Sequence, residues 1–217
     1  MNNNYHIIWD FNGTLVDDAW LFVELMNKLL KKRKLIERDV TFYRQNFCFP
    51  LYKYYEKLGF DLKREPFELP SVEFINLYEK NKYRANLFNG ILLILKKLKA
   101  SGHSNYIVSA QYEESLLDLV SFYKLSSYFK IIRGTNNLHA IGKDLIAKEL
   151  ISKFDKTKNR IIIIGDTNMD INIAKENNCQ AVGITYGHQS ENRFIKYNKL
   201  TKVNSVSDLN AYLSPLF

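Results

Sequence analysis

The chain has 217 residues, 46% of them hydrophobic, and its 31 Lys and Arg against 23 Asp and Glu give a formal net charge of +8. Such a chain can bury one core, with or without an inserted subdomain. We see no basic or long apolar leader and no run of about 18 apolar residues. We therefore expect a cytoplasmic protein without a membrane span, whose thiols, Cys48 and Cys179, are reduced and buried.

The first half of the chain predicts one strand followed by helices. The segment YHIIW at 5–9 is strand-like and ends at Asp10. Residues 17–34 have apolar side chains at helical spacing, with acids at the start and bases at the end, which predicts a helix. Further helices are predicted at about 51–59, 71–83 (opened by Pro70-Ser71) and 89–100 (capped by Asn89).

Strands and helices alternate in the second half. The predicted strands are 105–109, 128–132, 160–166 and 180–184, and the predicted helices are 113–123, 141–153 and 205–213. The strand at 160–166 contains four consecutive isoleucines, which is typical of a parallel strand buried on both faces. Ser205 and Asp208 are placed as a capping box for the last helix.

This alternation, with short links, predicts an α/β fold with a doubly wound parallel sheet. The helical block at about 16–87 interrupts the alternation after the first strand. We therefore expect a Rossmann-like core of residues 1–15 and 88–217, with 16–87 inserted as a helical cap.

The net positive charge fits either a nucleic-acid binder or an enzyme that attracts phosphorylated metabolites. The bases are spread along the chain, and the densest run, KKRK at 31–34, lies at a predicted helix end, where cations suit the helix dipole. The many Tyr and Phe residues form no ribonucleoprotein-type motif. We expect neither a nucleic-acid nor a membrane partner.

Polar side chains follow the predicted strands. The first strand ends at Asp10, the strand at 105–109 ends at Ser109, the isoleucine strand ends at Asp166, and Lys143 opens the preceding helix. Because ligands bind beyond the carboxyl ends of parallel strands, we expect these groups to surround one point. Carboxylates, a hydroxyl and an ammonium are the functional groups that phosphoryl transfer uses.

With these residues the sequence resembles the haloacid dehalogenase-like superfamily of phosphohydrolases, and most closely its phosphoglycolate phosphatase-like branch. The family's four motifs occur in order, as DFNGTL at 10–15, YIVS at 106–109, Lys143 within IGKD, and GDTNMD at 165–170. The helical block between the first two motifs is similar to the family's type-1 cap, so the resemblance covers nearly the whole chain.

The resemblance implies a Mg²⁺-dependent hydrolase of small phosphorylated metabolites. Asp10 would attack phosphorus, become an aspartyl phosphate, and bind Mg²⁺ together with the backbone carbonyl of Asn12. Asp166 would be the third protein ligand, and Asp170 would orient the site from nearby.

The resemblance also implies a phosphate-binding set. Ser109 and the backbone N–H groups around Ala110 would hold the phosphoryl oxygens, and Lys143 would neutralise their charge. Structural interpretations stay open, in which Ser109 caps the next helix, Lys143 lies on the surface, and Asp170 caps the helix that starts there. Substrate identity and oligomeric state are not determined by the sequence.

Four other acids and histidines are given no catalytic role. Asp17 and Asp18 are interpreted as first-turn acids of the first cap helix. His188, in the loop after the fifth strand, is placed to line the pocket, and His6, inside the first strand, is interpreted as a packed core histidine.

Asn12 stands where phosphatases of the superfamily usually have a second aspartate, whose acid–base catalysis is worth roughly 10²–10⁴-fold. One explanation, which we favour, is a phosphatase that uses another acid or a good leaving group. Another is a catalytically impaired protein that binds a phosphorylated metabolite, and a third is an engineered substitution. Metal-free dehalogenase chemistry is disfavoured by the intact GDTNMD motif. On the sequence alone, Asn12→Asp is expected to raise alkyl phosphate hydrolysis roughly 10²-fold.

Overall fold

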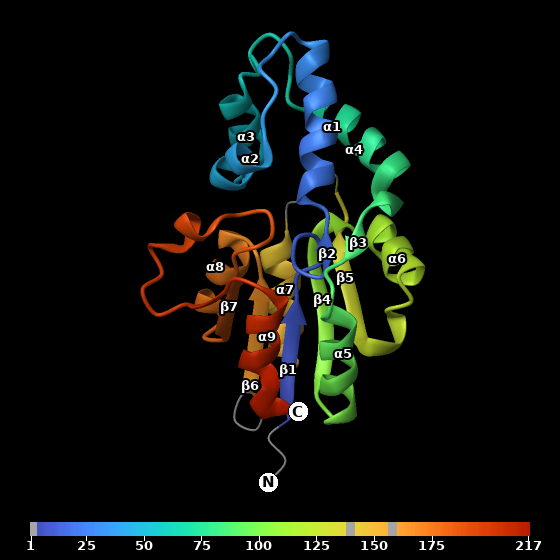
Figure 1. The fold of residues 1–217 in the computed structure, drawn as a ribbon, viewed down its shortest axis with the longest axis vertical. Helices are drawn as coiled ribbons and strands as arrows, with labels where there is room; N and C mark the ends of the chain where they lie inside the picture. The colour runs from blue at the N-terminus through green and yellow to red at the C-terminus, as the bar shows by residue number, and fades with distance from the viewer. Residues whose placement is uncertain (1–3, 138–141, 156–159) are drawn as a thin grey trace.

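The centre of the protein is a six-stranded parallel sheet (Figure 1). The computed structural model describes residues 4–137, 142–155 and 160–217. The strand order is β5-β4-β1-β6-β7-β8, with every neighbouring pair parallel. The strands are β1 Tyr5–Trp9, β4 Ser104–Tyr112, β5 Phe129–Thr135, β6 Arg160–Gly165, β7 Gln180–Ile184 and β8 Thr201–Val203. The predicted doubly wound parallel sheet is confirmed, with β8 as an edge strand that the sequence did not predict.

The isoleucine run of β6 is buried on both faces of the sheet. Ile162 and Ile164 pack in the larger core, with the apolar faces of α5 (Ile91–Ala100), α6 (Glu113–Phe122) and α9 (Val206–Leu213). Ile161 and Ile163 pack in a second core, with α7 (Lys143–Ser152) and α8 (Asn168–Glu176). Successive side chains of a strand point to opposite faces, so four apolar residues in a row require helices on both sides.

Four helices lie together beyond the carboxyl ends of the strands, at the top of Figure 1. They are α1 Ala19–Lys32, α2 Val40–Asn46, α3 Leu51–Leu58 and α4 Glu68–Asn81, and they share a hydrophobic core of their own. A two-stranded antiparallel ribbon, β2 (Val16–Asp17) with β3 (Asn86–Leu87), joins this group to the sheet. The arrangement supports the proposed cap at 16–87. Short 3-10 helices lie at Lys82–Arg84, Ser126–Tyr128, Glu191–Phe194 and Ser214–Leu216.

Several helix starts differ from the predicted ones. Helix α4 begins at Glu68, because Pro70 is tolerated in a first turn, where its missing N–H loses no helical bond. Helix α5 is preceded by Gly90 in a left-handed conformation, and not by Asn89. The Ser205 hydroxyl accepts the Asp208 N–H at 3.0 Å, but the Asp208 carboxylate accepts from a different N–H, so half of the capping box forms. The predicted start of α7 at residue 141 lies outside the described residues.

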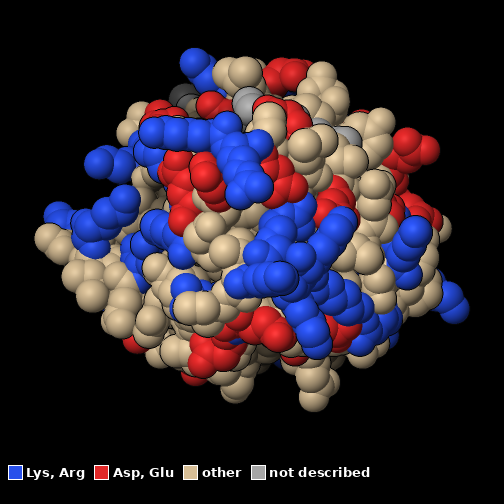
Figure 2. All heavy atoms as spheres, turned by 90° about the horizontal axis from the view of Figure 1, so that it is seen from above, with Lys and Arg blue, Asp and Glu red and all other residues tan. Residues whose placement is uncertain are grey.

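The surface at the cap end carries both signs of charge, as Figure 2 shows from above. In the KKRK run at the end of α1, Lys32 pairs with Glu73 at 2.8 Å, and Arg33 pairs with Glu73 and Glu65 at 2.8 and 2.6 Å. Two of the four residues of the densest basic run therefore pair with acids of the cap. Among the residues described, no helix combines the length and the apolar character that crossing a membrane requires. Cys48 and Cys179 are half-buried, where full burial was expected.

Candidate active site

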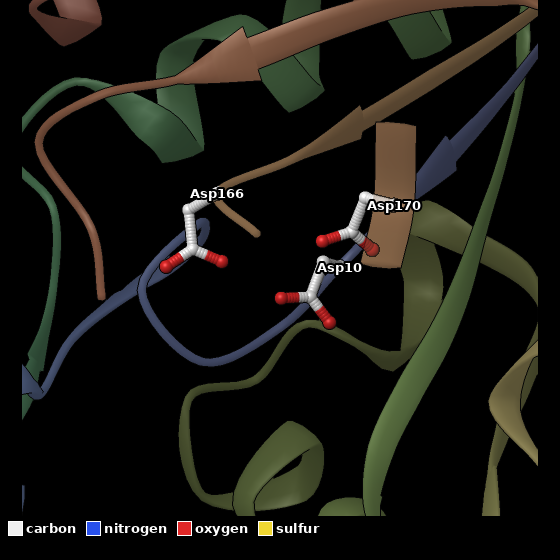
Figure 3. Close-up of side chains that lie close together, drawn as sticks. All are labelled: Asp10, Asp166 and Asp170. Atoms are coloured by element: carbon white, nitrogen blue, oxygen red, sulfur yellow. The ribbon is translucent and has the colours of Figure 1, made fainter. Parts of the chain in front are cut away.

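Three carboxylates converge at the carboxyl edge of the sheet (Figure 3). Asp10 directly follows β1 and Asp166 directly follows β6, and these two strands are hydrogen-bonded neighbours. Asp170 enters from the first turn of α8. Each side chain offers one oxygen that lies within 4.8 Å of the other two, and all three are buried. The strand order alone therefore brings together acids that are 156 to 160 positions apart in the chain.

Lys143, the first residue of α7, lies between two of these acids. Its Nζ is 2.5 Å from Asp10 Oδ1 and 2.6 Å from Asp170 Oδ1, and its side chain is almost completely buried. Burial opposes the charged ammonium, but the two carboxylates outweigh it and raise the pKa of Lys143. The interpretation of Lys143 as a surface lysine is wrong.

The site holds more negative than positive charge. When all three carboxylates are ionised, the single ammonium leaves two negative charges in excess in this buried cluster. Burial raises the pKa of Asp10 well above its usual value, Lys143 opposes this, and the neighbouring Asp170 and Asp166 reinforce it. Clustered carboxylate oxygens with uncompensated charge are the donor set that a hard divalent cation such as Mg²⁺ fits.

Asp170 caps a helix, and it also contacts the lysine of the site. Its Oδ2 accepts from the Thr167 N–H at 3.1 Å, as part of a capping box at the start of α8, and from the Thr167 hydroxyl at 2.7 Å. Its Oδ1 is the partner of Lys143. Helix capping thus fixes the carboxylate that in turn holds the lysine against Asp10.

Ser109 and Ala110 line the same cavity as Asp10 and Lys143. Strand β4 continues to Tyr112, three residues beyond its predicted end, and Tyr112 occupies the N-cap position of α6. The Ser109 hydroxyl accepts from the Gln111 N–H at 3.1 Å. Ser109 therefore does not cap the next helix, and that interpretation is wrong, whereas its role in holding phosphate stays a prediction.

The side chain of Asn12 is hydrogen-bonded to Asp18, which the sequence analysis interpreted as an acid in the first turn of the first cap helix. Asn12 Nδ2 donates to Asp18 Oδ2 at 2.6 Å and to the Tyr78 hydroxyl of the cap at 2.9 Å. Asp18 occupies the N-cap position of α1, but its side chain makes no capping bond and turns instead to the Asn12-Gly13 loop. The interpretation of Asp18 as a simple first-turn acid is wrong, while Asp17 is exposed on β2.

His188 is buried at the cavity wall, where the sequence placed it. Its Nε2 is 3.0 Å from Asp18 Oδ1, its Nδ1 is 2.5 Å from the Tyr43 hydroxyl, and its backbone N–H donates to Asp166. Burial lowers the pKa of His188, but Asp18 and the other nearby acids outweigh this and raise it. His6 is half-buried, stacks on Phe154 and bonds the Tyr106 hydroxyl, as a packing histidine does.

No pattern in the sequence indicated the roles of Tyr43 and Tyr78. Both belong to cap helices, and each reaches a loop of the sheet through its hydroxyl. The chain contains 14 tyrosines at no informative spacing, so only the packing of the cap singles out these two.

The cap is fastened to the sheet on two sides of the cavity. On one side, Arg44 Nε donates to the Gly187 carbonyl at 2.7 Å, and Gln189 Nε2 donates to the Phe47 carbonyl at 2.9 Å. On the other side, the buried Lys82 pairs with Asp118 of α6 at 2.8 Å. A cavity of about 750 Å³ lies between these contacts, with the acid cluster at its base. Its cap wall is mainly aromatic and includes Phe22, Phe47, Phe49, Tyr54, Phe74 and Tyr78.

Gly13, in the loop after β1, lies so close to Asp166 that a larger residue would collide with it. Its φ is +70°, and a Cβ there would lie 2.2 Å from Asp166 Oδ2 and equally close to His188 Cδ2. Gly13→Ala is expected to displace the Asp166 carboxylate and to abolish stabilisation by Mg²⁺, measured as the change in Tm on adding the ion. Gly102→Ala is the matched control, because its φ of +81° imposes a similar strain of about 1–2 kcal/mol with nothing within 4 Å of the new atom. Equal responses to Mg²⁺ in the two variants would contradict the assignment of Asp166 as a ligand.

Comparison with known proteins agrees with this geometry. The model of the family described as haloacid dehalogenase-like hydrolase matches residues 7–184. A 5'-nucleotidase of Pseudomonas aeruginosa is 23% identical over 193 residues, which cover 86% of this chain and 85% of the relative.

Solved structures share the fold over nearly the whole chain. A predicted phosphatase from Clostridium acetobutylicum superposes with a TM-score of 0.78 at 22% identity, covering 98% of this chain and 99% of that one. A predicted phosphoglycolate phosphatase from Haemophilus somnus superposes with a TM-score of 0.75 at 18% identity, covering 98% and 99%. At these identities the likeness establishes the fold.

Proposed function

Since the chain belongs to the haloacid dehalogenase-like hydrolase family, we propose that it is a Mg²⁺-dependent phosphohydrolase of small phosphorylated metabolites that works through an aspartyl phosphate. The observation that carries this proposal is the buried contact of Asp10 with Lys143, beside Asp166 and Asp170, at the base of the cavity between the cap and the sheet. A carboxylate nucleophile, a fixed ammonium and an acid pair are the parts that phosphoryl transfer requires.

Asp10 would be the nucleophile of the first displacement and the leaving group of the second. Lys143 holds its Oδ1, which leaves Oδ2 to attack phosphorus as the bond from phosphorus to the leaving oxygen breaks. The leaving oxygen then takes up a proton. Water next attacks the aspartyl phosphate, the bond from phosphorus to Asp10 breaks, and inorganic phosphate and the free carboxylate result.

Asp10, Asp166 and the backbone carbonyl of Asn12 would hold Mg²⁺, with Asp170 oriented beside them. When bound, the ion supplies positive charge that stabilises the transferring phosphoryl group. Lys143 adds a second positive charge, and Ser109 with the N–H groups around Ala110 would orient the phosphoryl oxygens.

The residues that line the cavity favour a leaving group that carries no carboxylate of its own. Among the lining residues that the structure describes, the lysines are Lys143 and Lys82, and His188, whose pKa is raised, already pairs with Asp18 at 3.0 Å. Lys82 already pairs with Glu79 at 2.7 Å and with Asp118, and Lys143 belongs to the phosphate site. A carboxylate on the leaving group would therefore lack a counter-charge, whereas an uncharged group with apolar surface would contact the aromatic wall of the cap.

A panel of phosphate esters, assayed with Mg²⁺ and with EDTA, tests the proposal. Because the relative from Pseudomonas aeruginosa is called a 5'-nucleotidase, the panel includes nucleoside 5'-monophosphates, besides phosphoglycolate, glycerol phosphate and p-nitrophenyl phosphate. We expect Mg²⁺-dependent release of phosphate that EDTA abolishes, with phosphoglycolate among the poor substrates. Binding of these esters without turnover would favour the alternative, a phosphometabolite-binding protein of the same fold.

A further inference from the structure

The side chain of Asn12 has a fixed orientation. An asparagine amide has two N–H donors on Nδ2 and an acceptor at Oδ1. The Asp18 carboxylate can only accept, so the group facing it at 2.6 Å is Nδ2, and the second hydrogen of Nδ2 is directed to the Tyr78 hydroxyl. Both donors are used, and Oδ1 is the atom that position 12 can offer to a ligand. Position 12 therefore presents an acceptor and no proton.

Asp18 is itself fixed by the groups around it. Its Oδ1 accepts from the Gly13 N–H at 3.0 Å and faces His188 Nε2 at 3.0 Å, while Oδ2 accepts from Asn12. The side chain is completely buried. His188 cannot turn away, because the Tyr43 hydroxyl holds its other ring nitrogen and the Phe22 ring packs on it with centroids 4.7 Å apart. Moving Asp18 would leave several buried polar groups without partners, at a cost for each of them.

We propose that Asp18 is a positioning residue that specifies an amide at position 12, so that Asn12 and Asp18 form a matched pair of hydrogen-bond donor and acceptor. The catalytic consequence rests on the proposed function, because it concerns proton supply to the leaving group. The pairing rests only on the hydrogen bonds, and it changes the expectation drawn from the sequence alone for Asn12→Asp.

A single Asn12→Asp substitution would place two carboxylates where one hydrogen bond of 2.6 Å now lies. When both are ionised, neither group can donate to the other, and like charges at that distance in a buried site repel strongly, so the pair would take up one shared proton. A proton held between positions 12 and 18 would not be free to serve the leaving group. We therefore expect the single variant to lose stability and to gain little activity.

The exchange Asn12→Asp with Asp18→Asn preserves every one of these bonds. The new amide at position 18 keeps an oxygen for the Gly13 N–H and for His188 Nε2, and its NH₂ group donates to the new carboxylate at position 12. The Tyr78 hydroxyl, which now accepts from Asn12, can instead donate to that carboxylate. The net charge of the pair is unchanged, and position 12 regains an acid–base group.

The experiment compares wild type, Asn12→Asp, Asp18→Asn and the double variant by Tm and by kcat on glycerol phosphate and p-nitrophenyl phosphate. We expect the double variant to hydrolyse glycerol phosphate roughly 10²-fold faster than wild type, with a much smaller gain on p-nitrophenyl phosphate, whose leaving group needs little protonation. Each single variant should gain less than about a tenth of that, and Asn12→Asp should have a lower Tm than the double variant.

The matched control combines Asn12→Asp with Asp17→Asn, which removes the same charge from the exposed neighbour of Asp18. It should behave like Asn12→Asp alone. Because an asparagine followed by glycine deamidates readily, intact mass must show that wild type keeps its amide. Equal kcat and Tm for Asn12→Asp and the double variant would overturn the proposal, as would an equal gain with the Asp17 control. If no variant hydrolyses any ester, the proposed function fails, and the Tm order alone decides on the pairing.

Discussion

Asp10→Asn is expected to lower the turnover of phosphate esters by roughly 10⁴-fold or more, because an amide cannot form the aspartyl phosphate. The replacement is nearly isosteric, and Lys143 keeps Asp170 as a partner at 2.6 Å, so the fold should be retained. Steady-state kcat and near-UV circular dichroism measure the two effects separately. Acid quenching of wild type during turnover should also trap phosphate on Asp10, and the variant should trap none.

Asp144→Asn is the control for this substitution, because Asp144 is an exposed acid in the first turn of α7, next to Lys143. It should leave kcat within a few fold of wild type. Turnover by Asp10→Asn within tenfold of wild type would remove Asp10 as the nucleophile, and would require another route from ester to phosphate.

Lys143→Ala is expected to be both inactive and destabilised. Lys143 is the counter-charge that the structure gives to Asp10 and Asp170, at 2.5 and 2.6 Å. Breaking a buried pair leaves an uncompensated charge and costs about 3–5 kcal/mol, whereas a surface pair contributes about 0–1 kcal/mol. Urea unfolding in EDTA should therefore show a large loss of unfolding free energy. Because the lysine is buried between two carboxylates, its loss is expected to affect stability as well as activity.

Mg²⁺ should restore part of this loss, since a cation held by Asp10 and Asp166 replaces some of the missing positive charge and stabilises the state that binds it. Lys148→Ala, which removes an exposed lysine from the same helix, should change neither unfolding nor kcat appreciably. If Lys143→Ala unfolds at the same urea concentration as Lys148→Ala and keeps normal turnover, Lys143 has no part in the site.

Much of the framework could be predicted because it depends on neighbours in the chain. The four isoleucines of β6 alternate between two cores, and a strand with two apolar faces is only stable with helices on both sides. From that sheet, Asp10 and Asp166 follow at adjacent strand ends, and the first turn of α8 adds Asp170. Helix α2 and strand β8 were not predicted, because both are short and have weak periodicity of their own.

The sequence by itself thus determined the sheet, its helical layers and the acids at the strand ends, since periodicity and turn residues act over a few positions. Only the tertiary structure decided what surrounds Asn12. Its amide donates to Asp18, at the start of the cap, and to Tyr78, which lies 66 positions away in the chain. His188 contacts Asp18 across 170 positions. Such contacts depend on how the cap closes on the sheet, and no local pattern encodes them. The hydrogen bonds of the amide at position 12 can therefore be known only from the folded site.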